Sequence, residues 1–198
     1  MTENEENLIL KKICCTNDLD TLLLYLTEVI EESGFSYYRI DLIDSKKENL
    51  IIKKIKFSEE HENTTKSVIG GKIPLNSQEE IMVLCYHKDD MIEINPDNLK
   101  KFGNTTLNRF NYFKIKYAYC IPLSKNNLKI GSLAIFSLNL PFDTNNMTLL
   151  KEKISLFIEP LNNFLAYQFL ITEGKENKNL LEKIGKVFEV AETINSLT

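Results

Sequence analysis

The sequence predicts an α+β fold, with one domain and an appended helical segment, from three observations. Residues Tyr117 to Asn139 read YAYCIPLSKNNLKIGSLAIFSLN, which is the pattern of two short apolar strands joined by an Asn-containing turn. An apolar helical pattern followed by two further strand patterns precedes this hairpin, and a long apolar helical pattern follows it. A length of 198 residues suits one domain plus an appendage.

Composition is that of a soluble globular protein, with 43% hydrophobic and 26% charged residues. The net charge of −4 and the lack of a basic stripe argue against nucleic acid as a partner. No apolar run approaches the ~20 residues of a membrane span, and the acidic start MTENEENLIL does not resemble a signal peptide. We therefore expect a cytoplasmic protein with neither a nucleic-acid nor a membrane partner.

The first half of the chain alternates helical and strand patterns. Leucines recur at helical spacing after Thr16 or Asn17, either of which can cap the helix, and Gly34 stops it. The expected elements are an N-terminal helical segment (1–16), a helix (17–33), two strands (35–44 and 49–57) joined by a turn, and a polar loop (58–66).

The second half begins with Gly70-Gly71 and ends in helix. Pro160 is expected to kink the long helix over Thr144–Ile171, because proline removes one helical hydrogen bond. The other expected elements are a strand (72–75), a helix capped by Ser77 and reaching Cys85, a short strand (91–94), two short helices (96–102 and 105–113) and the hairpin.

The hairpin resembles the last two strands of a GAF domain, the small-molecule-sensing module of signalling proteins. In that family a strand ending in Pro-Leu, here Pro122-Leu123, leads to a Gly-x-Leu-x-Ile/Leu strand, here Gly131, Leu133 and Ile135. The order of elements over 17–172 is similar too. The resemblance implies a GAF-like (profilin-like) antiparallel sheet of five to six strands. Its N- and C-terminal helices would lie on one face, and small helices and loops would cover a ligand pocket on the other. A PAS domain is the alternative, but it usually ends on a strand.

The last segment, 173–198, has the pattern of a coiled coil. Five apolar residues alternate at spacings of four and three: Leu180, Ile184, Val187, Ala191 and Ile194. This segment resembles a signalling helix, the linker that joins a sensor to an output domain. It implies a parallel homodimer and a C-terminal output domain that is absent from this chain, so we expect the chain to be part of a longer protein. The alternative is a helix folded back on the domain.

Candidate ligand-binding residues alternate along the first strand. Tyr38, Ile40 and Leu42 form an apolar face that should pack on helices. The opposite face carries Tyr37, Arg39 and Asp41, and we expect Arg39 to be neutralised by Asp41 or by an anionic ligand. Arg109 and Tyr112, where the family's pocket-covering helices lie, and Tyr119 of the hairpin complete the set. The alternative is an ordinary aromatic core with a structural Arg39–Asp41 contact.

Catalytic and cofactor motifs are missing from the sequence. There is no G-x-S-x-G, phosphate-binding glycine loop or H-E-x-x-H, and His87 with its neighbouring aspartates is too sparse for a metal site. The cysteines have no C-x-x-C spacing, which indicates free thiols in a reducing compartment; Cys120 is expected to be a small core residue. The family's signatures for cyclic nucleotides and for bilins are not matched. We therefore expect no cofactor and no metal.

These observations predict a non-catalytic GAF sensor or regulatory domain of a multidomain cytoplasmic signalling protein. It would bind an unidentified small molecule, or act by rearrangement of a dimer, to control a downstream output domain. Two alternatives remain open. A dimerisation spacer with no ligand would have a filled pocket, and a GAF-fold thiol enzyme of the methionine sulfoxide reductase type would have a reactive Cys85 or Cys120.

Overall fold

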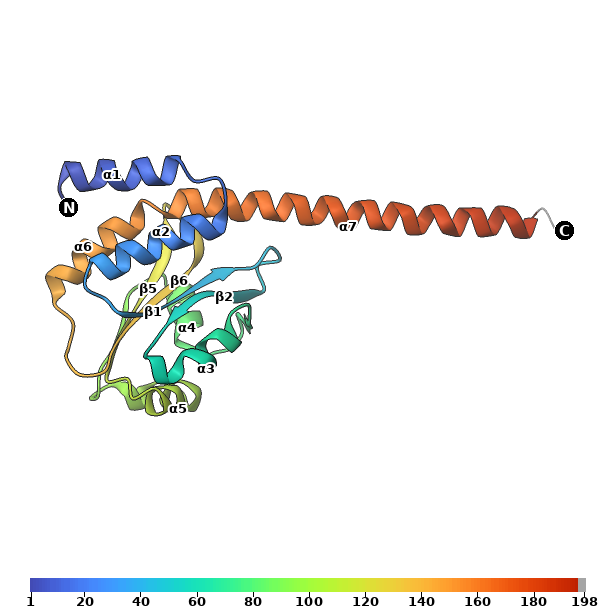
Figure 1. Cartoon of the computed structure of the whole chain (residues 1–198). Helices are drawn as coiled ribbons and strands as arrows, with labels where there is room; N and C mark the ends of the chain where they lie inside the picture. Colours follow the sequence, from blue (N-terminus) through green and yellow to red (C-terminus); the bar gives the residue numbers. More distant parts are fainter. Residues whose placement is uncertain (196–198) are drawn as a thin grey trace.

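A six-stranded antiparallel sheet in the order β3-β2-β1-β6-β5-β4 is the centre of the computed structural model (Figure 1). The structure describes residues 1–195, and the surroundings of side chains up to residue 175 and at Lys178. The predicted α+β fold with an antiparallel sheet is confirmed. The elements are α1 (Glu3–Cys14), α2 (Leu19–Glu32), β1 (Tyr37–Ile43), β2 (Asn49–Lys56), η1 (Glu59–His61), α3 (Glu62–Val68), β3 (Lys72–Pro74), α4 (Ile81–Lys88), β4 (Ile92–Ile94), η2 (Leu99–Lys101), α5 (Asn104–Tyr112), β5 (Tyr117–Lys125), β6 (Leu128–Ser137), α6 (Thr144–Ser155) and α7 (Ile158–Asn195).

Two hairpins build the middle of the sheet, and each has turn residues suited to it. Asn126 and Asn127 join β5 to β6 with φ of 52° and 66°, the left-handed pair that a two-residue hairpin turn of type I′ requires. In the β1–β2 turn, the Asp44 carboxylate accepts hydrogen bonds from the backbone N–H groups of Glu48 and Asn49. Because β1 pairs with β6, the two hairpins meet at the centre of the sheet.

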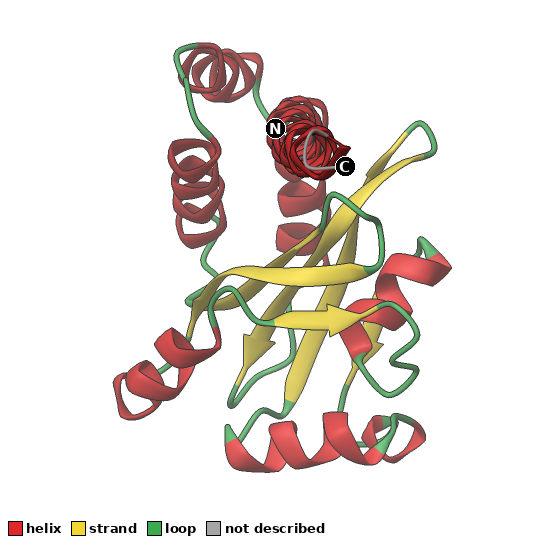
Figure 2. Ribbon diagram, turned by 90° about the vertical axis from the view of Figure 1, so that its right-hand side faces the viewer, coloured by secondary structure: helices red, strands yellow, loops and turns green. Residues whose placement is uncertain are grey.

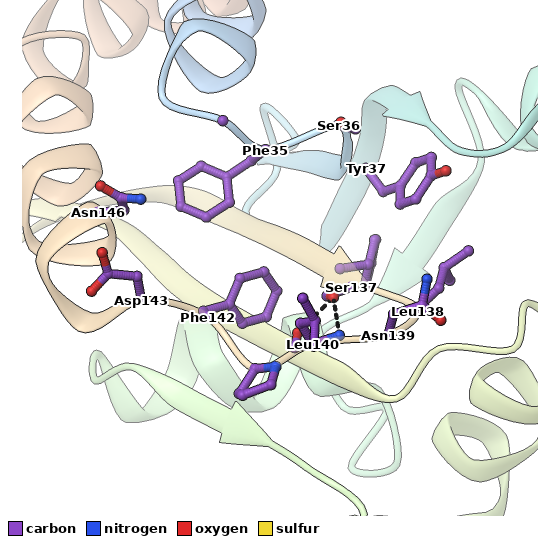
Figure 3. A pocket seen from close by; sticks show the side chains of 13 residues that line it. Phe35, Ser36, Tyr37, Ser137, Leu138, Asn139, Leu140, Phe142, Asp143 and Asn146 are labelled. Carbon is purple, nitrogen blue, oxygen red and sulfur yellow. Dashed lines mark hydrogen bonds between the residues drawn. The ribbon is translucent and has the colours of Figure 1, made fainter.

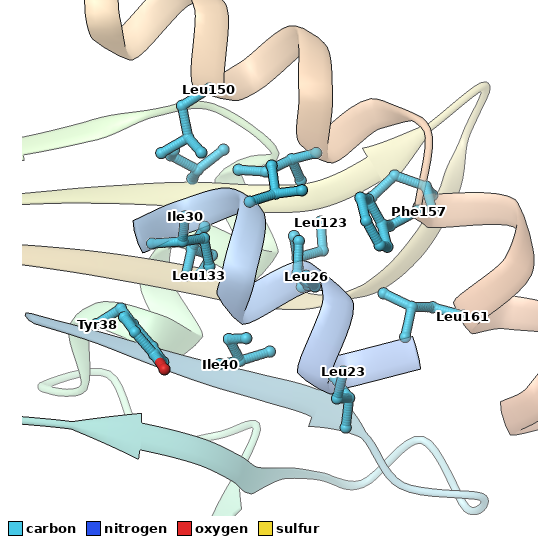
Figure 4. Packing of buried hydrophobic residues seen from close by; sticks show 14 of the residues in the cluster. Leu23, Leu26, Ile30, Tyr38, Ile40, Leu123, Leu133, Leu150, Phe157 and Leu161 are labelled. Carbon is cyan, nitrogen blue, oxygen red and sulfur yellow. The ribbon is translucent and has the colours of Figure 1, made fainter. Parts of the chain in front are cut away.

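Helices cover both faces of the sheet. Figures 1 and 2 show α2, α6 and the start of α7 on one face, and α3, α4 and α5 on the other. The predicted apolar face of β1 packs on the helices, as Figure 4 shows for Ile40 below α2. Other members of this core are Leu23, Leu26, Ile30, Tyr38, Leu123, Leu133, Leu150, Phe157 and Leu161. Phe157 and the leucines among them are almost fully buried.

The prediction of one helix over Thr144–Ile171 with a kink at Pro160 is wrong about the position of the bend. The break lies at Leu156 and Phe157, between α6 and α7, and the buried Phe157 ring fills the core at this point. Pro160 is the third residue of α7, in a first turn where its missing N–H leaves no helical bond unmade.

Helix α7 also runs without interruption through Glu173-Gly174-Lys175, where the sequence suggested a new start. The expected division between 172 and 173 therefore falls within one helix. The side chains of the predicted seam (Leu180, Ile184, Val187, Ala191 and Ile194) lie outside the described residues. Among the described helices, none has the length and hydropathy needed to cross a membrane.

Three smaller expectations on the α3–α5 side also need correction. The predicted loop 58–66 contains η1 and most of α3, which has Thr65 as its one buried residue and so no apolar stripe to signal it. Ser77 does not cap α4, which begins at Ile81 after a turn and has Glu80 at its N-cap. The helix expected over 96–102 is a single 3₁₀ turn, Leu99–Lys101.

Candidate ligand-binding cavity

A buried ion pair lies on the face of β1 that points away from α2. Arg39 donates from Nε to Asp41 Oδ1 at 2.8 Å and from Nη2 to Asp41 Oδ2 at 2.6 Å. Residues i and i+2 of a strand share a face, so the alternation along β1 places these two side chains together. The guanidinium exposes 9% of its side-chain surface and the carboxylate none. Arg39 is thus neutralised by Asp41 in this conformation, one of the two partners that the sequence allowed.

A second ion pair joins α5 to the segment before α4. Arg109 Nη1 donates to Glu80 Oε2, and the Glu80 side chain is 8% exposed whereas that of Arg109 is 44% exposed. Thr106 Oγ1 donates to the carbonyl of Glu79 at 2.7 Å, and the Thr105 hydroxyl donates to the Glu79 carboxylate at 2.8 Å. The start of α5 is therefore fastened to the turn before α4 by one ion pair and these hydrogen bonds.

Arg39 and Arg109 line the same cavity between the sheet, α4 and α5. They are the only arginines in the chain. The remaining walls are mainly apolar: Ile55, Phe57, Ile81, Met82, Thr106, Phe110, Phe113, Ile115 and Phe136. The cavity measures about 50 Å³, well below the ~300–1,000 Å³ of sites that enclose a drug-sized ligand. In this conformation it has room for a few waters at most.

Burial dominates the electrostatics of this cavity. It raises the pKa of the Asp41 carboxyl above its usual value, and the Arg39 guanidinium opposes that rise. Burial by itself acts to lower the pKa of Arg39, but the Asp41 charge outweighs it, so the pKa of the guanidinium lies above its usual range. Arg39 and Arg109 are the charged residues that line the cavity, and each is paired with a carboxylate that does not line it.

None of the three predicted tyrosines lines this cavity. Tyr37 stacks on Phe57 with ring centroids 5.0 Å apart and lines a different groove. Tyr112 on α5 is 55% exposed. Tyr119 shares the opposite sheet face with Tyr38, because each is paired with Ile135 of β6, and its hydroxyl donates to Glu93 at 2.8 Å. The structure therefore brings together Arg39, Asp41 and Arg109 from the predicted set, and adds Glu80.

The groove beside Tyr37 lies where the α2–β1 connection meets the loop between β6 and α6 (Figure 3). It measures about 330 Å³ and is open to solvent. Ser137 organises its floor: the hydroxyl donates to the Leu140 carbonyl at 2.7 Å and accepts from the Leu140 N–H at 3.3 Å. Both bonds are internal to the loop between β6 and α6. Asp143 is the one charged residue among those that line the groove.

The two cysteines on the α4 side have the properties of core residues. Cys85 and Cys120 are both fully buried. Burial raises the pKa of the Cys85 thiol to about 12 and raises that of Cys120 well above its usual value. A nucleophilic cysteine needs the thiolate form near neutral pH and access to its substrate. Among the described residues, no cluster of three or more His, Cys, Asp or Glu side chains is placed to hold a metal ion.

Thiol labelling of the native protein should therefore stop at two groups per chain. Cys14 and Cys15 are exposed and should react with an aromatic disulfide reagent at pH 7.5, whereas Cys85 and Cys120 should react only after denaturation. Titration in buffer and then in guanidinium measures both numbers. Rapid native labelling of Cys120 would contradict its assignment to the core and revive the thiol-enzyme alternative.

No model of a known protein family matches the sequence, and no curated protein sequence does either. Solved structures do match. The GAF domain of a two-component sensor histidine kinase from Bacillus halodurans superposes with a TM-score of 0.63 at 15% identity, covering 77% of this chain and 99% of that one. The GAF domain of a phosphoenolpyruvate-protein phosphotransferase from Coxiella burnetii gives a TM-score of 0.64 at 11% identity, covering 82% and 93%. The chain has the fold of a GAF domain.

GAF-fold proteins that match this chain include an enzyme as well as regulatory domains. The free methionine-R-sulfoxide reductase of Neisseria meningitidis superposes with a TM-score of 0.57 at 14% identity, covering 79% of this chain and 85% of that one. At such identities the likeness concerns the GAF fold and not the activity. The activity has to be judged from this chain's own residues, and the buried Cys85 and Cys120 lack the accessible thiolate that a thiol enzyme needs.

Proposed function

We propose that this GAF domain is a non-catalytic sensor of a signalling protein, and that the cavity between the two arginines is its ligand site. One observation carries the proposal. The only two arginines of the chain converge on one cavity from elements 70 residues apart in sequence (positions 39 and 109), each on a carboxylate. GAF domains of a sensor kinase and of a phosphotransferase among the structural neighbours support a role in signalling.

The ligand would be a small polar molecule that carries an anionic group. Arg109 is the accessible arginine, because its side chain is 44% exposed whereas that of Glu80 is buried. Only Nη1 of Arg109 donates to Glu80, and a guanidinium has five N–H donors. A carboxylate or phosphate can therefore bind the remaining donors of Arg109 while both ion pairs stay intact. Because the cavity is only about 50 Å³, entry of the ligand must move α5 away from the sheet. Binding would thus select an open state over the closed one.

The signal would cross the sheet through β1. Arg39 lines the cavity, while its neighbours Tyr38 and Ile40 on β1 pack in the core with α2 and α7. A shift of β1 toward either face therefore alters the packing under the start of α7. Helix α7 then leads away from the domain (Figure 1).

A thermal-shift screen tests the ligand site. We expect at least one member of a panel of small carboxylates and phosphates, each at 1 mM, to raise Tm by about 2 °C or more. This is the shift expected when the Kd of the ligand lies well below the ligand concentration used. Arg109→Gln should abolish the shift. Lys114→Gln, on the same side of the sheet in an exposed pair with Glu60, is the matched control and should retain the shift. A shift that survives Arg109→Gln would place the ligand elsewhere.

A dimerisation spacer without a ligand is the second candidate, and the small cavity volume favours it. In that case the two ion pairs serve only to fasten α5 and β1, and no panel member should raise Tm. The screen therefore separates the two candidates.

In either case we propose a parallel homodimer that presents paired α7 helices to a C-terminal output domain, in the cytoplasm. Tyr167 and Leu170 on α7 are 63% and 64% exposed, and Ile171 is 40% exposed. Together they form an apolar patch of the kind that marks an association surface. In a parallel two-fold dimer these patches face each other and the following segments run side by side, as the coiled-coil pattern of Leu180 to Ile194 predicts.

A further inference from the structure

A larger groove lies on the face of the sheet that α2 and α7 cover, on the other side from the arginine cavity. It measures about 710 Å³ and separates the β1–β2 hairpin from the first turns of α7. In Figure 1 the hairpin extends in the same direction as α7 and below it. This volume falls within the range of small-molecule sites.

The floor of the groove is apolar. Side chains from β2, β6 and α7 contribute to it: Ile51, Leu128, Leu165, Ala166 and Phe169. Ile51 is only half-buried, whereas Leu42 of the neighbouring strand is fully covered. The groove is thus the part of this sheet face that the helices leave open.

The rim of the groove is positively charged. Five lysines line it: Lys46, Lys47, Lys53, Lys72 and Lys129. Lys129 lies 3.6 Å from Asp89, but the other four form no ion pair with any residue whose side chain is described. The one acid in the lining, Asp44, is occupied by Asn49 and the backbone of the turn. This concentration of positive charge contrasts with the chain's net charge of −4.

We propose that this groove is a second binding site, and that it takes a small amphipathic anion. The apolar body of the ligand lies on Ile51 and Phe169, and its carboxylate or phosphate head contacts Lys53 and Lys72, which extend from adjacent strands. Ile51 is paired with Lys72, so the floor and the rim adjoin at this point. A bare anion would leave the floor unused, and a neutral amphiphile would leave the lysines without a partner.

The position of the site gives the ligand a role separate from that of the arginine cavity. An occupant contacts the β1–β2 hairpin and α7 together, and so holds the start of α7 against the sheet. This inference does not depend on the arginine cavity's binding anything.

Calorimetric titration of the full chain with octyl phosphate and octanoate, both monomeric at the concentrations used, tests the proposal. We expect a Kd below about 1 mM for at least one of them, with the difference between the two identifying the preferred head group. Lys53→Glu/Lys72→Glu should weaken binding at least about tenfold. Lys100→Glu/Lys101→Glu makes the same change of charge at two exposed residues of η2 and should leave Kd unchanged. Ala166→Trp, at an exposed position of α7, should block the floor and weaken binding similarly.

Three probes complete the test. Inorganic phosphate and octyl glucoside should each bind at least about tenfold more weakly than octyl phosphate, because each lacks one half of the interaction. A separate peptide with the sequence of residues 3–14, which is acidic and amphipathic, should also bind more weakly than octyl phosphate. The proposal is overturned if neither octyl anion binds, if the Lys53/Lys72 variant binds as well as the wild type, or if any of the three probes binds as tightly as octyl phosphate.

Discussion

Asp41→Ala should lower the free energy of unfolding by about 3–5 kcal/mol, because it leaves the Arg39 guanidinium buried without a partner. Asp41 is fully buried and accepts both hydrogen bonds of the bidentate pair. No other carboxylate is hydrogen-bonded to Arg39, since Glu80 is committed to Arg109. Urea unfolding followed by circular dichroism at pH 7 measures the loss as a change in midpoint at constant slope.

The matched control removes both charges. Arg39→Met/Asp41→Leu fills the same space with apolar side chains. We expect the free energy of unfolding of this double variant to lie within about 1 kcal/mol of the wild-type value, or above it. The reason is that the desolvation cost of a buried ion pair offsets much of the attraction between its charges. An Asp41→Ala variant as stable as the wild type would show that the pair is hydrated and not buried.

Gly131→Ala should lower the free energy of unfolding by about 3 kcal/mol, which is the upper end of the range for overpacking a protein core. A β-carbon on Gly131 would lie 2.0 Å from the carbonyl oxygen of Asp41 and 3.0 Å from the Cα of Leu42. Both contacts are with backbone of β1, the central strand, so no side-chain rotation relieves them. For a chain of this size we expect Tm to fall by about 6–12 °C, measurable by differential scanning calorimetry.

Gly174→Ala is the natural control for this change. Nothing lies within 4 Å of a β-carbon built on Gly174, which sits inside α7. Alanine there should raise helix stability by about 1 kcal/mol. Equal effects of the two substitutions, or an unchanged Tm in Gly131→Ala, would mean that β1 and β6 are not as close as the structure has them.

The hairpins and main helices were predictable because local chemistry decides them. Asn126 and Asn127 tolerate positive φ and fix the β5–β6 turn. The break before α7 was not predictable from Pro160, because a proline in a first turn disturbs nothing. Helix α3 was missed because its stability comes from docking on β2, without an apolar stripe of its own.

The candidate site was predictable only where two residues share one strand. Arg39 and Asp41 follow from alternation along β1, and Arg109 was placed by family resemblance. Glu80 was missed because its partner lies 29 positions away, and no local pattern separates it from the chain's other acidic residues. Tyr119 was included in the predicted ligand set, but the structure places it on the other sheet face, which is set by a β5–β6 register that shifts between Leu123 and Ser124.

A signal that leaves this domain through two parallel α7 helices, as we propose, needs those helices to lie side by side. In a Cys14→Ser/Cys15→Ser background, a spin label on Lys178→Cys reports directly on their separation, since Lys178 is exposed and Cys85 and Cys120 are buried. Packed helices lie about 8–10 Å apart, so dipolar spectroscopy at tens of micromolar protein should give one narrow distance below about 25 Å. Ile184→Glu/Ala191→Glu should abolish it by placing like charges in the seam. No dipolar coupling in the labelled wild type, or the same distance in the charged variant, would contradict the account.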